Sequence, residues 1–304
     1  EDNAEFGFGM RLAVDQNRTT LKSYAEKVMA SEQAPADLKA ALEKALSHWD
    51  DSKTEEAIKD QADAKAIIDK YAAECDCPDL AKVKELEDYF TDKSVWIIGG
   101  DGWANDIGYG GIDHVLAQNK NVNILVLDTE VYSNTGGQAS KSTPTGAVAK
   151  FATGGKKTYK KNMGLMSMSY GYVYVASVAL GADRGQTLKA FQEAEAYDGP
   201  SIIFAYAPCI AHGIDMSKTQ TEQKRAVEAG YFPLYRYNPA NPEQPFTWDA
   251  KDPKGSYQDF IRSEGRYKSL MKTNPEHAEA LYQQAESDAA KRMNVYKAVG
   301  ELMK

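Results

Sequence analysis

Apolar residues at helical spacing dominate the first third of the chain. Leucines recur at every fourth position over 38–46 with charged residues between them, which places one apolar stripe along a helix. A second helix is expected at about 54–75, and Pro78 separates it from a third. Residues 4–28 mix apolar and polar positions and predict one amphipathic helix or a pair of helices. This polar helical region shows no pattern of catalytic residues.

The pattern changes at residue 94, where short continuous apolar runs replace the helical stripes. SVWII (94–98) and VNILVL (122–127) predict buried strands, with a glycine-rich turn and a helix at roughly 104–119 between them. This order is a βαβ unit, whose strands are parallel. The alternation continues with strands at 172–176 and 201–206 and a helix at 186–197. The sequence therefore predicts an α/β domain with a doubly wound, mostly parallel sheet.

The last part of the chain combines an extended segment with helices. Five of the eleven prolines fall within 233–253, which predicts an irregular, extended segment. Asn274-Pro275-Glu276 then opens a helix that continues to the C-terminus, with Asn274 as its N-cap. The predicted parts are a helical portion of the α/β domain (1–30), an acidic helical insertion (31–93), the α/β core (94–215), and the extended segment with a helical C-terminal extension (216–304).

Charge and cysteine content exclude several classes of protein. The net charge is −8, and the first 94 residues hold 13 Lys and Arg against 22 Asp and Glu, which argues against a nucleic-acid partner. An apolar run long enough to cross a membrane is absent from the sequence. Three cysteines suggest no disulfide framework, so a reducing, cytoplasmic compartment is expected. The chain starts at Glu1 without a signal-peptide pattern and is expected to be a piece of a longer protein.

Polar loops follow the first two predicted strands. Gly100-Asp101-Gly102 ends one strand, and Asp128 to Asn134 follows the next, so both loops are expected at the edge where open α/β sheets bind ligands. Glycines let a diphosphate approach the backbone, and a helix N-terminus favours anionic oxygens. The Asp101 carboxylate, the Thr129 hydroxyl and the Val131 carbonyl are the hard oxygen ligands that Mg²⁺ prefers.

A purely structural interpretation of the first loop competes with this one. A Gly-Asp-Gly turn after a strand occurs by chance, and an Asp in that place is often an N-cap. The second polar loop, 28 residues further on, favours a binding site. A Rossmann dinucleotide site does not fit, because residues 100–105 read G-D-G-W-A-N and lack its third glycine.

The segment GDGWANDIGYGGIDHVLAQNKNVNILVLDTEVYSNTGGQ (100–138) resembles the thiamine-diphosphate motif of the pyruvate:ferredoxin (or flavodoxin) oxidoreductase family. The resemblance continues through 140–156, 168–183 and 195–214. It implies the thiamine-diphosphate-binding fold, with Mg²⁺ held by Asp101, Thr129 and the Val131 carbonyl. It also implies that Asn134 lies near the reacting carbon. The residues implied to surround the cofactor are Gly100, Asp101, Gly102, Trp103, Thr129, Glu130, Val131, Tyr132, Ser133 and Asn134.

Cys209 follows the last predicted strand of the core. Without the resemblance, a lone cysteine there is usually a small buried hydrophobe. The resemblance implies that it is one of four thiolates on a [4Fe–4S] cluster. Cys75 and Cys77 lie in the acidic insertion and are interpreted as incidental.

The resemblance also implies parts that this chain lacks. The other cluster ligands and the pyruvate-binding domain are expected N-terminal to Glu1, so the chain is expected to be a C-terminal part that is inactive alone. The implied reaction is oxidative decarboxylation of pyruvate with coenzyme A, with electrons passed to ferredoxin or flavodoxin, in a homodimer. Two alternatives stay open: another 2-oxoacid as substrate, or an inactive binding or assembly module.

Three weaker candidates accompany these. The pairs Lys156-Lys157 and Lys160-Lys161 predict a solvated basic loop, with attraction of coenzyme A phosphates or of an acidic ferredoxin as the alternative. His212, three residues after Cys209, is a candidate to support the cluster from behind its ligand. Trp103 is predicted to form one wall of the cofactor site.

Overall fold

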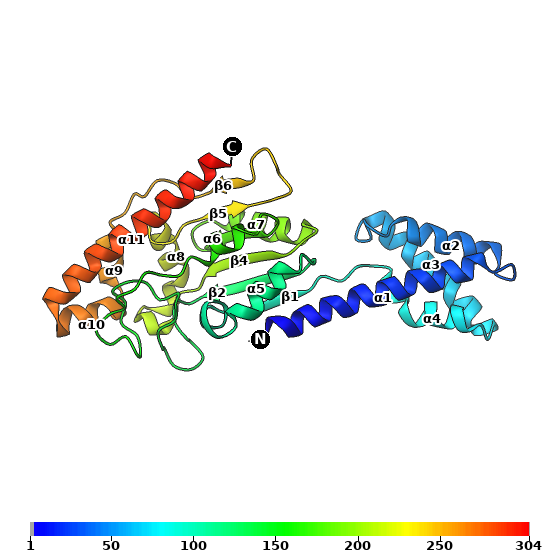
Figure 1. Cartoon of the computed structure of the whole chain (residues 1–304), viewed down its shortest axis with the longest axis horizontal. Coiled ribbons are helices and arrows are strands. Elements are labelled where there is room, and N and C mark those ends of the chain that lie inside the picture. The colour runs from blue at the N-terminus through cyan, green and yellow to red at the C-terminus, as the bar shows by residue number, and fades with distance from the viewer. Residues whose placement is uncertain (1–2, 304) are drawn as a thin grey trace. The chain divides into compact units, whose positions relative to one another are not determined.

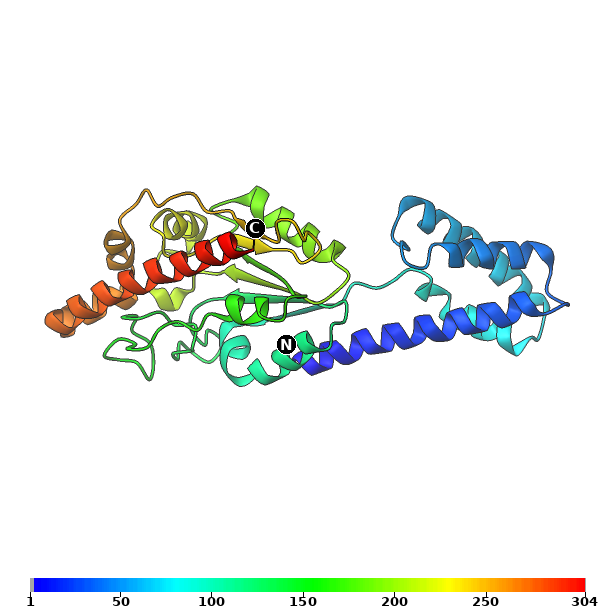
Figure 2. The ribbon, with the colours of Figure 1, turned by 45° about the horizontal axis from the view of Figure 1, so that its top comes forward.

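A computed structural model describes residues 3–303, which form two compact units. The α/β unit holds the chain up to Gly7 and from Trp96 onward, and the helical unit is Phe8–Val95. Figures 1 and 2 show the ribbon of the whole chain in two views. Within the described residues, no helix combines the length and the hydropathy that a membrane span needs.

The α/β unit is built on one six-stranded sheet, with strand order β1-β2-β4-β3-β5-β6 (Figure 1). The first four strands in that order pair in parallel, and β5 pairs antiparallel with both β3 and β6, which confirms the prediction of a mostly parallel sheet. The strands are β1 (Trp96–Gly100), β2 (Asn123–Asp128), β3 (Tyr174–Val178), β4 (Ser201–Tyr206), β5 (Tyr235–Tyr237) and β6 (Phe246–Trp248). Because β1 and β2 are neighbours in register, the loops after them meet at one edge of the sheet.

Both faces of the sheet are covered, as alternation along β3 shows. Tyr174, Ala176 and Val178 pack with α7 residues on one face, while Ser177 faces α6 and α11 on the other. The helices of this unit are α5 (Tyr109–Ala117), α6 (Met163–Met168), α7 (Arg184–Ala196), α8 (Thr219–Glu228), α9 (Tyr257–Ser263), α10 (Gly265–Thr273) and α11 (Pro275–Leu302). The Asn274 side chain accepts a hydrogen bond from the His277 backbone, so its prediction as the N-cap of α11 is confirmed.

The helix expected at 104–119 starts as one π-helical turn, Trp103–Ile107, before α5 continues it. The Trp103 indole packs between Gly99 and Gly108. A Cβ atom at either glycine would clash with this ring. The space that the Trp103 ring needs therefore explains the glycines at positions 99 and 108.

The segment 233–253 is more regular than its prolines predict. It forms the short strands β5 and β6, which add two antiparallel strands to the sheet. The prolines stand outside these three-residue strands, where they remove no ladder hydrogen bond. Buried Tyr235 and Phe246 stack beside Tyr296 of α11, so packing rather than local sequence pattern makes these strands.

The helical unit has an apolar core of its own. Its helices are α1 (Ala4–Ala30, from Phe8 onward), α2 (Ala36–Ser47), α3 (Glu55–Glu74) and α4 (Pro78–Leu86), with a short 3₁₀ turn at Glu87–Tyr89. The expected boundary at residue 30 differs from the structural one at Phe8, because α1 is a single unbroken helix whose second half packs with α2 to α4. The core residues are Leu21, Ala25, Val28, Leu38, Leu42, Ala45, Ala64, Ile68, Leu80, Val83, Leu86 and Phe90.

Candidate functional site

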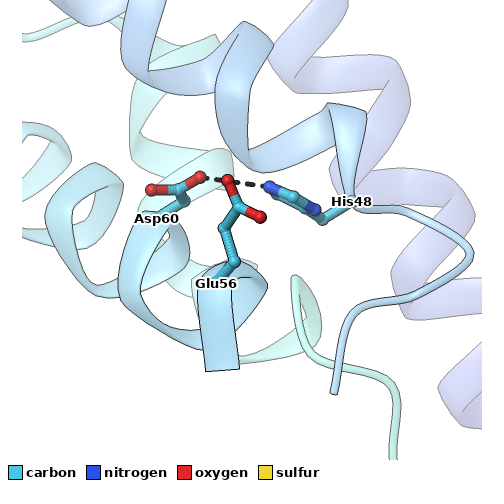
Figure 3. Close-up of side chains that lie close together, drawn as sticks. All are labelled: His48, Glu56 and Asp60. Atoms are coloured by element: carbon cyan, nitrogen blue, oxygen red, sulfur yellow. Dashed lines mark hydrogen bonds and ion pairs between the residues drawn. The ribbon is translucent and has the colours of Figure 1, made fainter. Parts of the chain in front are cut away.

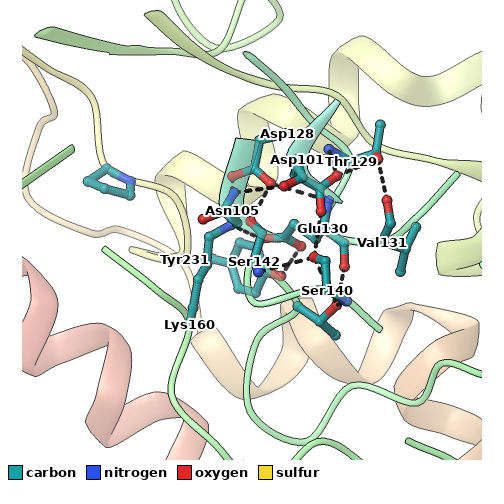
Figure 4. A network of polar contacts seen from close by, with 12 residues as sticks. Asp101, Asn105, Asp128, Thr129, Glu130, Val131, Ser140, Ser142, Lys160 and Tyr231 are labelled. Atoms are coloured by element: carbon teal, nitrogen blue, oxygen red, sulfur yellow. Dashed lines mark hydrogen bonds and ion pairs between the residues drawn. The ribbon is translucent and has the colours of Figure 1, made fainter. Parts of the chain in front are cut away.

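The three predicted magnesium ligands lie together at the carboxyl edge of the sheet (Figure 4). Asp101 follows β1, and Thr129 and Val131 follow β2. The Thr129 hydroxyl oxygen lies 2.8 Å from Asp101 Oδ1 and 3.0 Å from the carbonyl oxygen of Val131. Since this hydroxyl has one proton, it donates to only one of these acceptors at a time.

The two separations at the Thr129 hydroxyl are hydrogen-bond lengths, and they are also compatible with oxygens that share one Mg²⁺ ion. Octahedral Mg²⁺ binds oxygen at about 2.0–2.1 Å, which puts neighbouring ligand oxygens about 2.9 Å apart. The two separations at the Thr129 hydroxyl, 2.8 and 3.0 Å, match this edge length. The donors therefore fit Mg²⁺ in distance as well as in chemistry.

The Asp101 carboxylate is buried, and among residues 3–303 no cation lies at hydrogen-bond distance from it. Ser140 Oγ donates to its Oδ2 at 2.5 Å and the Thr129 amide to its Oδ1 at 3.1 Å. Burial, together with the charge of nearby Asp128, nevertheless raises the pKa of Asp101 to about 7. A divalent cation at the three oxygens would supply the missing positive charge.

The glycines of the first loop differ in what surrounds them. A Cβ atom at Gly100 would meet no heavy atom within 4 Å, so the backbone there is open to a ligand. A Cβ at Gly102 would lie 2.5 Å from the Tyr132 ring, so this glycine admits the aromatic side chain of the second loop. The Trp103 ring is buried and packs against the backbone at Gly99 and Gly108, and its place beside a cofactor stays a prediction.

Glu130 directs its side chain into a buried ion network, away from the three predicted magnesium ligands. Its carboxylate lies 2.8 Å from Lys160 and 2.8 Å from Arg266, and Tyr231 donates to it. Lys160 also pairs with Asp128 at 2.7 Å. Burial opposes the charge of Glu130, but the two cations outweigh it and hold its pKa well below the ordinary range. The backbone of Glu130 is in the left-handed region, with φ of +59°, and its carboxylate points into the ion network.

The predicted solvated lysine loop is wrong for three of its four members. Lys160 is in the ion network, and Lys156 donates to the carbonyls of the 140–143 turn. Lys161 lies 3.2 Å from the ring centre of Tyr109, and only Lys157 of the four is exposed. The other three lysines are not solvated because nearby loops direct carbonyl and carboxylate oxygens inward, and the lysine ammonium groups donate hydrogen bonds to them. Burial lowers the pKa of Lys156 to about 8.

Cys209 lies beside the second loop. It follows β4, is buried, and its sulfur lies 3.2 Å from Ser133 Oγ. Its apolar neighbours include Val131. The structure therefore brings together Cys209 and the loop that ends in exposed Asn134. Cys75 and Cys77 belong to the helical unit.

His212 contacts the second loop from behind. Its Nε2 donates to the Thr129 carbonyl at 2.8 Å, which requires the proton on that nitrogen. Burial, and then the charge of Arg266, lowers the pKa of His212 to about 3, so the ring is neutral. Its Nδ1 lies 3.7 Å from Glu264 Oε1, and burial raises the pKa of Glu264 to about 7. The spacing from Cys209 pointed to His212, whereas Glu264 and Arg266 lie far along the chain and carried no signal.

The chain is similar in sequence to known proteins. Residues 80–205 match the family model described as thiamine pyrophosphate enzyme, C-terminal TPP binding domain. The chain is 55% identical over 99% of its length to a pyruvate:ferredoxin oxidoreductase of Moorella thermoacetica, and 50% identical over 97% to a pyruvate-flavodoxin oxidoreductase of Nostoc sp.. It is also 45% identical over 98% to a mitochondrial pyruvate dehydrogenase [NADP(+)] of Euglena gracilis.

The chain spans only part of these relatives. It covers 26% of the Moorella protein, 25% of the Nostoc protein and 16% of the Euglena protein. The matched family segment includes both polar loops and most of the parallel sheet.

Proposed function

We propose that this chain holds Mg²⁺ and thiamine diphosphate for an enzyme of the pyruvate:ferredoxin or pyruvate-flavodoxin oxidoreductase type. The chain is homologous to about a quarter of such proteins, and it contains a match to a thiamine pyrophosphate-binding domain. The observation that carries the proposal is the set of three oxygens at the sheet edge. The Thr129 hydroxyl lies 2.8 and 3.0 Å from the other two oxygens, separations that an octahedral Mg²⁺ ion would accept, in a part of the chain that matches the thiamine pyrophosphate domain.

The residues divide the work of holding the cofactor. Asp101, the Thr129 hydroxyl and the Val131 carbonyl bind Mg²⁺, which in turn binds the diphosphate. The open backbone at Gly100 accommodates the diphosphate oxygens. Asn134 is exposed at the end of the second loop, where its amide hydrogen-bonds to the substrate. When bound, thiamine diphosphate supplies a carbanion that attacks the carbonyl of a 2-oxoacid and stabilises the charge left by decarboxylation.

The complete enzyme, in this proposal, oxidises pyruvate. Pyruvate loses carbon dioxide, its other two carbons leave as acetyl-coenzyme A, and two electrons pass singly to ferredoxin or flavodoxin. Cys209 supplies one of four thiolates for a [4Fe–4S] cluster beside the site, and the other three come from the rest of the protein. Cys209 is suited to this because it is buried next to the loop that carries Asn134. The complete protein works as a homodimer, and the isolated chain is inactive.

The electron acceptor is set outside this chain. Relatives whose names contain ferredoxin, flavodoxin and NADP(+) all match it over 97–99% of its length. Since the chain aligns over nearly its whole length with proteins named for different electron acceptors, we infer that it serves a step that these proteins have in common. That step is the cleavage of pyruvate at the thiamine cofactor.

Replacement of Thr129 by valine in the complete enzyme tests the proposal. The variant keeps the shape of the side chain but loses one Mg²⁺ ligand. Loss of a group that only supports a ligand costs about 10–100-fold in metal affinity, so loss of the ligand itself costs at least that much. We expect the Mg²⁺ concentration for half-maximal pyruvate oxidation to rise at least about tenfold, with activity partly recovered by excess Mg²⁺.

Thr153→Val is the matched control, since Thr153 is exposed in a loop outside the site. It should oxidise pyruvate like the unmodified enzyme at every Mg²⁺ concentration. An unchanged Mg²⁺ requirement in Thr129→Val would contradict the proposed ligand set.

A further inference from the structure

A second cluster of ligating side chains lies in the helical unit, where His48 ends α2 and Glu56 and Asp60 stand one turn apart on α3 (Figure 3). His48 Nε2 lies 3.1 Å from Asp60 Oδ2. One ligand atom each from His48, Glu56 and Asp60 lie within 4.8 Å of one another. On the other side of the ring, His48 Nδ1 lies 3.4 Å from Asp51 Oδ1.

The imidazole of His48 therefore faces a carboxylate at each nitrogen. A neutral imidazole has one N–H, so it donates to only one of the two carboxylates and turns a lone pair toward the other. A lone pair against a carboxylate is repulsive unless a positive charge lies between them. That charge is either a second proton on the ring or a metal ion.

The surroundings favour a cation at the Nε2 side. Asp60 is buried, and Lys44 holds its other oxygen, Oδ1, at 2.6 Å. The hydrogen bond from Lys44 lowers the pKa of Asp60, which keeps it ionised at neutral pH. The carboxylates of Asp51, Glu56 and Asp60 thus lie around one histidine, and Lys44, the cation that pairs with Asp60, carries a single positive charge. Asp51 can orient the ring through Nδ1–H, as carboxylates commonly do behind metal-binding histidines.

We propose that this cluster binds a divalent transition-metal ion of the zinc type through His48 Nε2, Asp60 Oδ2 and the Glu56 carboxylate. Tetrahedral zinc bonds of about 2.0–2.2 Å place ligand atoms about 3.3–3.5 Å apart, close to the 3.1 Å between Nε2 and Oδ2. Glu56 is exposed and free to rotate toward the ion. An imidazole nitrogen in the set favours zinc over magnesium or calcium. Water completes the fourth position, as at other three-ligand zinc sites.

The histidine rings allow a direct test, because the chain has only four histidines. The 304-residue chain is labelled with ¹⁵N-histidine and titrated with Zn²⁺ at pH 7.5, with excess Mg²⁺ and a reductant present. The ring signals of His48, His114, His212 and His277 are assigned by single His→Asn substitutions. We expect the Nε2 signal of His48 to shift with one equivalent of Zn²⁺ while the signal of His277 does not.

Variants separate the metal site from a doubly protonated histidine. Glu56→Gln changes an exposed side chain and should fold normally, yet weaken Zn²⁺ binding at least about tenfold, and Asp51→Asn should weaken it about 10–100-fold. His277→Asn, the matched control, should leave the affinity unchanged. A His48 signal that responds to pH but not to Zn²⁺ would overturn the proposal, as would equal Zn²⁺ affinity in Glu56→Gln and the unmodified chain.

Discussion

Replacing Lys160 by methionine removes the cation that two buried carboxylates share. Lys160 Nζ lies 2.7 Å from Asp128 and 2.8 Å from Glu130, and the carboxylate side chains are 7% and 1% exposed. Methionine keeps most of the side-chain length but no charge. Glu130 retains Arg266, whereas Asp128 retains only neutral donors such as Ser142 Oγ.

The expected cost follows from breaking one side of a buried ion pair. Removal of one partner leaves an uncompensated buried charge and typically costs about 3–5 kcal/mol in the free energy of unfolding. Lys157→Met removes the same charge from an exposed position and should stay within about 0.5 kcal/mol. Because Asp128 is the carboxylate left alone, Asp128→Asn added to Lys160→Met should recover part of the loss, by about 0.5–3 kcal/mol.

The assay is urea unfolding followed by tryptophan fluorescence in a Trp49→Phe background. Trp49 is the tryptophan of the helical unit, so the remaining three report on the α/β unit. Lys160 does not compensate the buried charge of Asp128 if Lys160→Met is as stable as Lys157→Met, or if the double variant is less stable than Lys160→Met.

Four further predictions concern the site itself. Mg²⁺ must bind ionised Asp101, whose pKa is about 7, so Mg²⁺ affinity measured by calorimetry should fall about tenfold per pH unit below pH 7 and level off above it; affinity independent of pH would contradict this. The same raised pKa means that without a cation the folded state binds the extra proton between about pH 4 and 7, so stability falls as pH rises through that window. Gly100→Ala should unfold like the unmodified chain yet bind thiamine diphosphate more weakly, whereas Gly102→Ala should be destabilised by its contact with the Tyr132 ring; equal stability of the two would be inconsistent with the packing. Cys209→Ser in the complete enzyme should lower the iron content by one cluster per chain, and iron analysis that shows no change would exclude Cys209 as a ligand.

The parallel core of the fold was predictable because the local sequence pattern identifies its strands. Continuous apolar runs end in polar loops, and the run 201–206 matches β4 residue for residue. The juxtaposition of Asp101 and Thr129 followed from one rule, that neighbouring parallel strands end at the same edge. The same local signals failed for β5 and β6, which are three residues long and exist because Tyr235 and Phe246 stack on α11.

The direction of individual side chains was the part that sequence could not supply. Lys160 stands beside Lys161 in a run that reads as solvated, yet it is buried because Asp128 and Glu130 turn inward and need a cation. Glu130 sits within the binding loop, yet its carboxylate serves Arg266, which lies 136 residues further along the chain. Such pairings depend on long-range contacts that leave no spacing in the sequence.

The cofactor content of the complete enzyme is the most direct test of whether this chain holds thiamine diphosphate through Mg²⁺ at Asp101. The complete enzyme is isolated anaerobically, and the small molecules released on denaturation are quantified by mass spectrometry. We expect about one thiamine diphosphate per chain in the unmodified enzyme and almost none in Asp101→Asn, which keeps the side-chain shape but loses the charge that Mg²⁺ requires. Equal amounts of thiamine diphosphate in the two proteins would contradict this expectation.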